Sequence, residues 1–112
     1  MYFKCRVYSP TQETNSKVEK IDWATSSVTD VNGETYAIDV VKILPYIGFN
    51  DEDGKEIYEG DILQYGKAKI RVIYDSFRAA FDLLVVEGDT ESLKVSDVSK
   101  MKFLKHYDTL WV

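Results

Sequence analysis

Three observations predict a mainly β protein, with an N-terminal β-hairpin subdomain followed by a small C-terminal β-barrel. Short segments alternate apolar and polar residues with the two-residue period of half-buried strands. Residues that favour tight turns separate these segments at a spacing typical of small barrels. No stretch of about ten residues shows the periodicity of an amphipathic helix. We expect the boundary near residue 48, which gives an N-terminal subdomain at 1–48 and a barrel with an acidic lead-in turn at 49–112.

The N-terminal part is expected to begin with a strand in which Cys5 and Val7 face the same side. Asn32-Gly33 predicts a two-residue hairpin turn of type I′, because both residues tolerate positive φ. Pro45 should end the last element, because proline cannot continue a helix. The expected elements are strands at 3–8, 17–25, 28–31 and 34–38, a polar loop at 9–16 and a single helical turn at 39–42.

The C-terminal part is expected to consist of consecutive strands after Gly60, with tight turns between neighbouring strands. Two of these strands are long enough to show which side chains face the core. The expected strands are 61–65, 69–74, 79–86, 93–95 and 101–106, with a helical turn at 96–99. The side chains expected in the core are Ile70, Val72 and Tyr74 on one strand, and Phe81, Leu83 and Val85 on the next.

Composition and charge argue against several classes of protein. The net charge of −5 argues against non-specific DNA binding, which draws its affinity from neutralising phosphates. Cys5 is the single cysteine, so no disulfide can form within the chain, which favours a reducing cytoplasm. No apolar run is long enough to span a membrane, and Lys4 and Arg6 interrupt any signal peptide, so we expect no membrane association.

Residues 51–61 hold six carboxylates and one lysine, which together account for the whole net charge. An EF-hand calcium loop aligned on Gly54 would lack both its first ligand and its bidentate glutamate. Glu59 and Asp61 could share a proton in a desolvated cleft, but the neighbouring sequence supplies no nucleophile. A turn that leads into a strand accounts for every residue, so we expect no metal, no cofactor and no catalytic residue here.

The same stretch resembles the signature of the YopX family of phage and prophage proteins. These proteins carry a Thr-Gly-Leu-x-Asp-x-x-Gly-x-x-Ile-Tyr-Glu-Gly-Asp-Ile/Val run near the middle of a chain of similar length. Ile47 replaces the usual Thr, and both ends of the chain match the family more loosely. The resemblance implies an N-terminal β subdomain, an SH3-like C-terminal barrel and homo-oligomerisation in a bacterial host, and it implies no reaction. The matching residues are Gly48, Asp51, Gly54, Ile57, Tyr58, Glu59, Gly60 and Asp61.

The remaining candidates for chemistry are few. His106 is the only histidine, so a zinc site would lack ligands. Cys5 and His106 could in principle act as nucleophile and base. The alternating pattern around Cys5 instead favours a buried, inert thiol. We therefore expect that the protein is not an enzyme.

A basic cluster is expected on the first barrel hairpin and its neighbour. Lys69 and Arg71 should share the strand face opposite the core. Small barrels often bind nucleic acid with such a face and with stacked aromatic side chains. The alternatives are a solvated strand face and a contact with the acidic stretch of another subunit. The cluster consists of Lys67, Lys69, Arg71 and Arg78.

The first hypothesis is a non-enzymatic, cytoplasmic, phage-derived protein that forms a homo-oligomer. The N-terminal strands are the expected interface, because they are too thin to bury both faces and would expose unpaired edges. Its target would be an unknown phage or host protein. The alternative is a nucleic-acid-binding module that uses the basic face of the barrel, and an enzyme is the third candidate.

Overall fold

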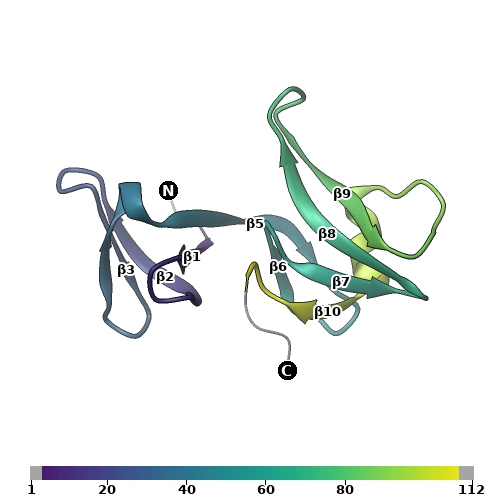
Figure 1. The fold of residues 1–112 in the computed structure, drawn as a ribbon, viewed down its shortest axis with the longest axis horizontal. Coiled ribbons are helices and arrows are strands. Elements are labelled where there is room, and N and C mark those ends of the chain that lie inside the picture. Colours follow the sequence, from purple (N-terminus) through teal and green to yellow (C-terminus); the bar gives the residue numbers. More distant parts are fainter. Residues whose placement is uncertain (1–3, 109–112) are drawn as a thin grey trace. The chain divides into compact units, whose positions relative to one another are not determined.

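The computed structural model describes residues 4–108 and confirms a mainly β chain with antiparallel strands (Figure 1). The described chain forms two compact units, of residues 4–45 and of Tyr46–Tyr107. The strands are β1 (Cys5–Ser9), β2 (Thr14–Asp22), β3 (Ser27–Asp30), β4 (Thr35–Ala37), β5 (Lys42–Asn50), β6 (Glu56–Tyr58), β7 (Ile62–Tyr65), β8 (Ala68–Asp75), β9 (Ala80–Glu87) and β10 (Lys102–Lys105). Two 3-10 helices, η1 (Ile38–Val40) and η2 (Val95–Lys100), complete the described elements.

The first unit contains β4, β3, β2, β1 and the first half of β5, which belong to one antiparallel sheet with the order β4-β3-β2-β1-β5-β6. Its buried apolar cluster consists of Val7, Val28 and Tyr36. Val18 and Ile21 pack against this cluster but stay partly exposed. Among the described residues of this unit the one helix is the three-residue η1, so no helical layer covers the sheet.

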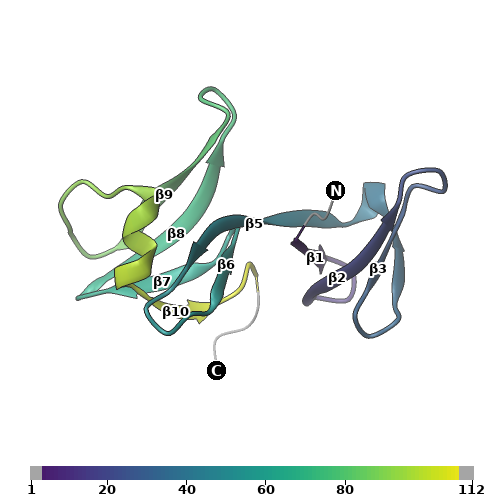
Figure 2. The ribbon, with the colours of Figure 1, turned by 180° about the vertical axis from the view of Figure 1, so that it is seen from behind.

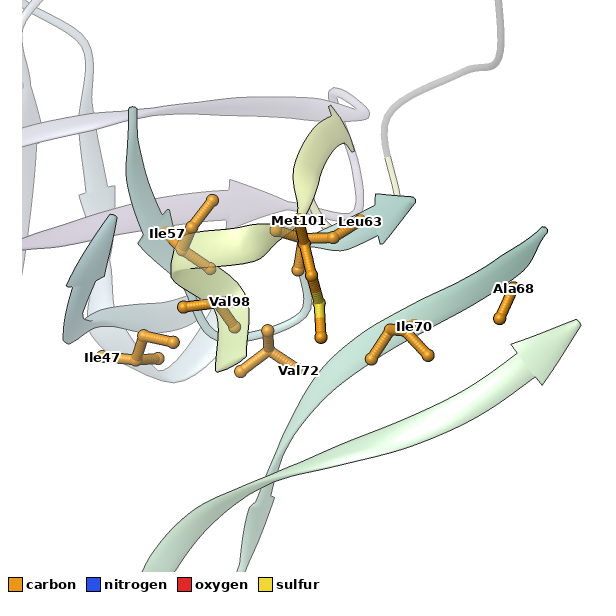
Figure 3. Close-up of a cluster of buried hydrophobic side chains, with 8 residues drawn as sticks. All are labelled: Ile47, Ile57, Leu63, Ala68, Ile70, Val72, Val98 and Met101. Carbon is orange, nitrogen blue, oxygen red and sulfur yellow. The ribbon is translucent and has the colours of Figure 1, made fainter. Parts of the chain in front are cut away.

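The second unit contains the four-stranded sheet β10-β7-β8-β9 and the larger core. Alternate residues of β8 are buried, as the sequence predicts for Ile70 and Val72. The helix η2 lies over this face of the sheet and contributes Val98 to the core (Figure 2). The strand pairings of the described residues do not close this sheet into a ring. Figure 3 shows the buried cluster, which comprises Ile47, Ile57, Leu63, Ala68, Ile70, Val72, Val98 and Met101.

The β8–β9 hairpin extends past this core (Figure 1), and two of the core positions expected on it are wrong. Tyr74 and Val85 are exposed rather than buried. Tyr74 lies near the hairpin end, where its ring packs edge-on against Phe81 with centroids 5.5 Å apart. Phe81 and Leu83 do pack against the core from its margin, as predicted.

The strands β5 and β6 were not predicted, because Pro45 was expected to end the preceding element. In the structure β5 runs through this proline. Its first half pairs with β1, up to the register Cys5↔Pro45. Its second half pairs with β6, starting at Tyr46↔Tyr58. Proline is tolerated here because the strand changes partner at this point, so a missing N–H interrupts no continuous ladder.

Three local expectations are also wrong. The strand β2 starts at Thr14, inside the expected loop, because residues 14–17 pair with β1. Residues 93–95 form no strand, and η2 begins at Val95 instead. The β3–β4 turn is not of type I′, because Gly33 has φ +87° while Asn32 keeps a negative φ. The turn is therefore a three-residue loop, Val31-Asn32-Gly33, with glycine in the left-handed position.

Candidate functional site

The acidic stretch begins with a turn, Asp51–Lys55, that we call the Asp51 turn. Asp51 is buried, and its Oδ1 accepts the N–H groups of Asp53 (2.9 Å) and Lys55 (2.8 Å). Gly54 takes the left-handed conformation with φ +82°. The other carboxylate oxygen, Oδ2, accepts the Phe103 N–H at 3.0 Å, from 52 residues away. Asp51 thus closes its own turn and attaches strand β10 to it.

A second turn, at Asp30–Glu34 in the first unit, repeats this arrangement. Asp30 Oδ1 accepts the N–H groups of Asn32 (2.9 Å) and Glu34 (3.0 Å), and Gly33 is left-handed. Asp30 Oδ2 accepts the Ser16 hydroxyl at 2.7 Å. The shared Asp-x-x-Gly spacing is visible in the sequence and would have predicted both turns. Its recurrence in a segment outside the signature indicates a structural device rather than a binding site.

Both turn aspartates are held ionised by this arrangement. Burial by itself raises the pKa of Asp51, but the hydrogen bonds from the backbone of Lys55, Phe103 and Asp53 outweigh it and lower the pKa. Burial likewise opposes the lowered pKa of Asp30, and the hydrogen bonds from Ser16 and the turn backbone prevail. Ionised carboxylates with filled acceptor positions have little capacity left for a metal ion.

Asp51→Asn should lower the free energy of unfolding by about 2 kcal/mol, because its amide group would face the Phe103 N–H donor to donor. The exposed neighbour Asp53 provides the control Asp53→Asn, which should be close to neutral. Urea titrations at pH 7 measure both values. Equal stability of the two variants would contradict the role given to Asp51.

The pH dependence of these variants follows from the lowered pKa of Asp51. As the pH falls, the unfolded chain protonates this carboxyl first, near its ordinary value of 3.8. Its contribution to stability is therefore fully present above about pH 4 and is lost as the pH falls through the lower folded-state pKa. Asp51→Asn should lose less stability than the wild type between pH 5 and about pH 3.

The signature ends in a second buried carboxylate, Asp61, which meets the only histidine. Asp61 Oδ1 lies 2.8 Å from His106 Nδ1, and the side chains are 1% and 14% exposed. Asp61 Oδ2 accepts the Tyr58 N–H at 2.9 Å. An ionised carboxylate only accepts hydrogen bonds, so Nδ1 carries the proton and donates it. The His106 ring also lies against Phe103, with centroids 4.6 Å apart.

Gly60 adds a close backbone approach to the same place. Its φ is +85°, and a Cβ built on it would lie 2.7 Å from Tyr107 Cβ. The Gly60 N–H donates to Val72 O at 2.8 Å, which fixes the turn to strand β8. The Arg71 guanidinium lies 5.8 Å from the centroid of the Tyr107 ring. We call Gly60, Asp61, His106 and Tyr107 the C-terminal clamp.

The other signature residues also have structural roles. Gly48 and Gly54 have positive φ, and Ile57 is fully buried in the core. Tyr58 is buried, its hydroxyl donates to Glu56 at 3.1 Å, and its ring lies 5.7 Å from that of Tyr46. The interpretation of the whole signature as structural stays a prediction.

The carboxylates of the acidic stretch do not converge on one point. Within residues 4–108, no group of three or more histidine, cysteine or acidic side chains could hold a metal ion. Glu59 and Asp61, the pair considered as an acid couple, are not linked to each other by any hydrogen bond described here, and Asp61 is held by His106 and Tyr58. The absence of a calcium site remains a prediction.

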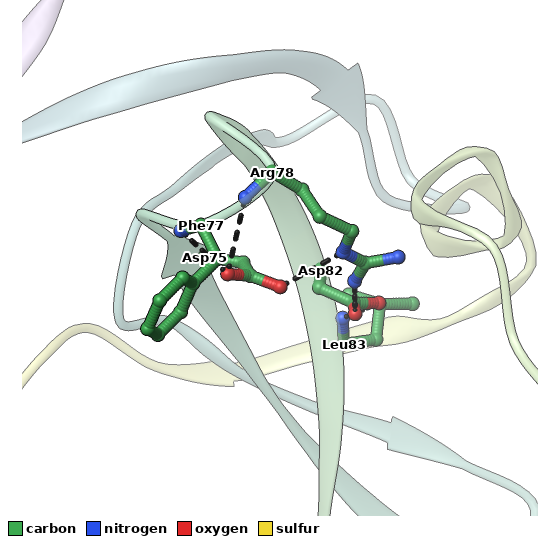
Figure 4. Close-up of polar contacts among 5 residues, drawn as sticks. All are labelled: Asp75, Phe77, Arg78, Asp82 and Leu83. Carbon is green, nitrogen blue, oxygen red and sulfur yellow. Dashed lines mark hydrogen bonds and ion pairs between the residues drawn. The ribbon is translucent and has the colours of Figure 1, made fainter.

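The four basic residues of the expected cluster do not form one unneutralised face. Lys69 and Arg71 do alternate with buried residues of β8, as predicted. Lys69 forms an ion pair with Glu87 at 3.0 Å. Arg78 lies at the tip of the hairpin, where it holds Asp75 and Asp82 (Figure 4). The hydrogen bond that Arg78 donates to Asp75, then the one it donates to Asp82, raises the pKa of Arg78, and Arg78 in turn lowers the pKa of Asp75.

Cys5 is buried in strand β1 of the first unit, as the sequence predicts. Burial raises the pKa of its thiol to about 11. The thiolate is the nucleophilic form, so Cys5 is inert at neutral pH. His106 belongs to the second unit and is engaged by Asp61 instead.

A polar hollow of about 320 Å³ lies beside η2, with Tyr65, Glu91 and Lys100 in its lining. Asp97, which also lines it, already caps η2 by accepting the Lys94 N–H at 2.7 Å. Lys100 lies 3.9 Å from the same Asp97 carboxylate. The charged groups of this hollow are thus directed at one another.

Comparison with known proteins gives one match. Residues 3–107 match the family model described as YopX protein, which spans both units. No curated protein matches the chain. No helix within residues 4–108 is long and apolar enough to cross a membrane.

Proposed function

The chain belongs to the YopX family, and we propose that it is a non-enzymatic, phage- or prophage-derived protein that works as a homo-oligomer assembled through its first unit. We place it in the bacterial cytoplasm, with an unknown phage or host protein as its target. For the second unit we propose an SH3-like arrangement, which its short antiparallel strands and the 3-10 helix before the last strand support.

The observation that carries the proposal is the single-layered sheet of the first unit. A sheet with one apolar face is stable only when another layer covers that face. The buried cluster of Val7, Val28 and Tyr36 is small, and the apolar side chains around it remain partly exposed. A second copy of the chain would supply the missing layer. These partly exposed side chains are Val18, Ile21, Ile38, Val41 and Ile43.

Two exposed apolar side chains lie at one end of this sheet. Trp23, in the β2–β3 turn, is 73% exposed. Val40, in η1, is also exposed. The Ile38 N–H donates to Ser26 O at 2.9 Å, so η1 and the β2–β3 turn lie at the same end of the sheet. Buried tryptophans are the side chains that contribute most to protein interfaces, so Trp23 is the expected anchor.

An enzymatic role has little support, since the buried carboxylates serve the backbone and the one thiol is inert. Nucleic-acid binding ranks second. Two of the four cations that would contact phosphate, Lys69 and Arg78, are paired with Glu87, Asp75 and Asp82, so their charge is offset before any ligand arrives.

Trp23→Ser should dissociate the oligomer, because it removes the largest exposed apolar side chain among the described residues of the first unit. Phe49→Ser is the matched control, since Phe49 is an exposed aromatic residue of the second unit. Size-exclusion chromatography with light scattering measures the mass of each variant at tens of micromolar. The contact is apolar, so it should survive ~1 M salt, which shortens electrostatic screening to ~3 Å. Equal masses for Trp23→Ser and wild type would count against the first unit as the interface.

A further inference from the structure

The strand β9 is the one long edge of the two sheets described. It lies at the end of the order β10-β7-β8-β9 and is eight residues long. The other sheet edges, β4, β6 and β10, are only three, three and four residues long. Natural proteins protect long edges with lysine, proline, bulges or covering segments, because unpaired backbone groups invite another strand. Residues 80–87 contain neither lysine nor proline.

This edge is apolar as well as long. Leu84, Val85 and Val86 are 48%, 38% and 46% exposed. Three consecutive exposed aliphatic side chains on an edge strand form a surface suited to burial against another strand.

The two acidic residues of β9 are neutralised from within the hairpin. Arg78 holds Asp82 (Figure 4), and Lys69 holds Glu87. Two copies of the strand can therefore approach each other without an uncompensated like charge. Two residues of the basic cluster, Lys69 and Arg78, thus neutralise the acidic side chains of this edge.

We propose that β9 pairs antiparallel with β9 of a second copy, with Leu83 on the two-fold axis. This contact lies on the second unit, so it goes beyond the proposed function, which concerns the first. The pairing covers residues 81–85 and stops before the register shift beside Val86, where a bulge disrupts the edge. When two identical strands pair antiparallel about a two-fold axis within one continuous sheet, odd-numbered residues lie opposite odd-numbered residues of the second copy. One residue can therefore lie opposite its own copy, on the axis.

The side chains are self-complementary in this register. Phe81 faces Val85 of the second copy, and Leu83 faces its own copy, so one face of the joined sheet is wholly apolar. On the other face Asp82 lies opposite Leu84 of the second copy. The Leu83 N–H now donates to Asp82 Oδ1 at 2.8 Å. Pairing exchanges this local acceptor for a backbone carbonyl, while Arg78 keeps the other carboxylate oxygen of Asp82.

The position opposite Asp82 allows a test by charge. Leu84→Glu sets two carboxylates against each other across the contact, while Leu84→Lys sets a cation against Asp82. Within one chain the two substitutions should have the opposite electrostatic effects, because Leu84 pairs with Arg71 of β8. Glutamate there is favourable to the monomer and lysine is unfavourable. A weaker contact in Leu84→Glu therefore cannot come from a less stable monomer.

Light scattering of the full chain at tens of micromolar should show that Leu84→Glu lowers the mass of the assembly by a factor of about two, because a two-fold contact doubles whatever it joins. Leu84→Lys should keep the wild-type mass. The inference is overturned when Leu84→Glu has the wild-type mass, or when both variants lower it alike. Trp23→Ser should leave the β9 contact intact, so failure of one interface is distinguishable from failure of the other.

Discussion

His106→Ala should lower the free energy of unfolding by about 3 kcal/mol, because it leaves one oxygen of the buried Asp61 carboxylate without its hydrogen-bond partner. The Asp61 side chain is only 1% exposed, so water cannot replace the imidazole as it would at the surface. The Tyr58 N–H would remain as its donor, on the other carboxylate oxygen. Chemical denaturation at pH 7 measures the loss.

A double-mutant cycle with Asp61→Asn separates the pair from its surroundings. Asp61→Asn removes the carboxylate that is hydrogen-bonded to His106, so the two substitutions together should cost less than the sum of their separate effects. The expected difference is about 1 to 2 kcal/mol. Additive effects would show that Asp61 and His106 contribute independently, and the clamp would then be no more than two neighbouring side chains.

Gly60→Ala should cost about 3 kcal/mol, of which the left-handed backbone accounts for one part and the contact with Tyr107 for the other. A Cβ at residue 60 would lie 2.7 Å from Tyr107 Cβ, which no relaxed structure tolerates. Gly54→Ala is the matched control. Gly54 has a similar φ of +82° but nothing within 4 Å of its Cβ position, so only the backbone cost of about 1 kcal/mol applies.

Removing the Tyr107 ring does not relieve this contact fully, because the nearest atom is its Cβ. Tyr107→Gly in the Gly60→Ala background removes both the Cβ and the ring. The two substitutions should then cost less together than their separate effects predict. Identical losses for Gly60→Ala and Gly54→Ala would contradict the close approach at Gly60.

The sequence predicted the strands with clear alternation, since burial on one face is a local property of the chain. Ile70 and Val72 are examples. It did not predict β5, because Pro45 interrupts the pattern and is tolerated only through a change of pairing partner that depends on the fold. The predicted boundaries of elements near turns were wrong for the same reason, because they depend on which strand lies alongside in the fold. Thr14 joins β2 because β1 lies beside it.

The site residues show the same division. Asp51, Gly54, Gly60 and Asp61 stand out in the sequence, and their turn geometry follows from it. The partners of Asp51 and Asp61 do not follow from the sequence, because they are distant along the chain. His106, for example, lies 45 residues from Asp61. The Asp-x-x-Gly spacing at Asp30 was present in the sequence and could have been found by comparing the two turns.

The mass of the wild-type protein in solution tests the central claim, that this YopX protein functions as an assembly of its own copies. Light scattering across a range of protein concentrations, in low and in high salt, measures it directly. We predict one defined mass that is a whole multiple of the 12.9 kDa chain. A monomer at tens of micromolar in low salt would contradict the proposed function and would favour nucleic acid as the ligand of the second unit.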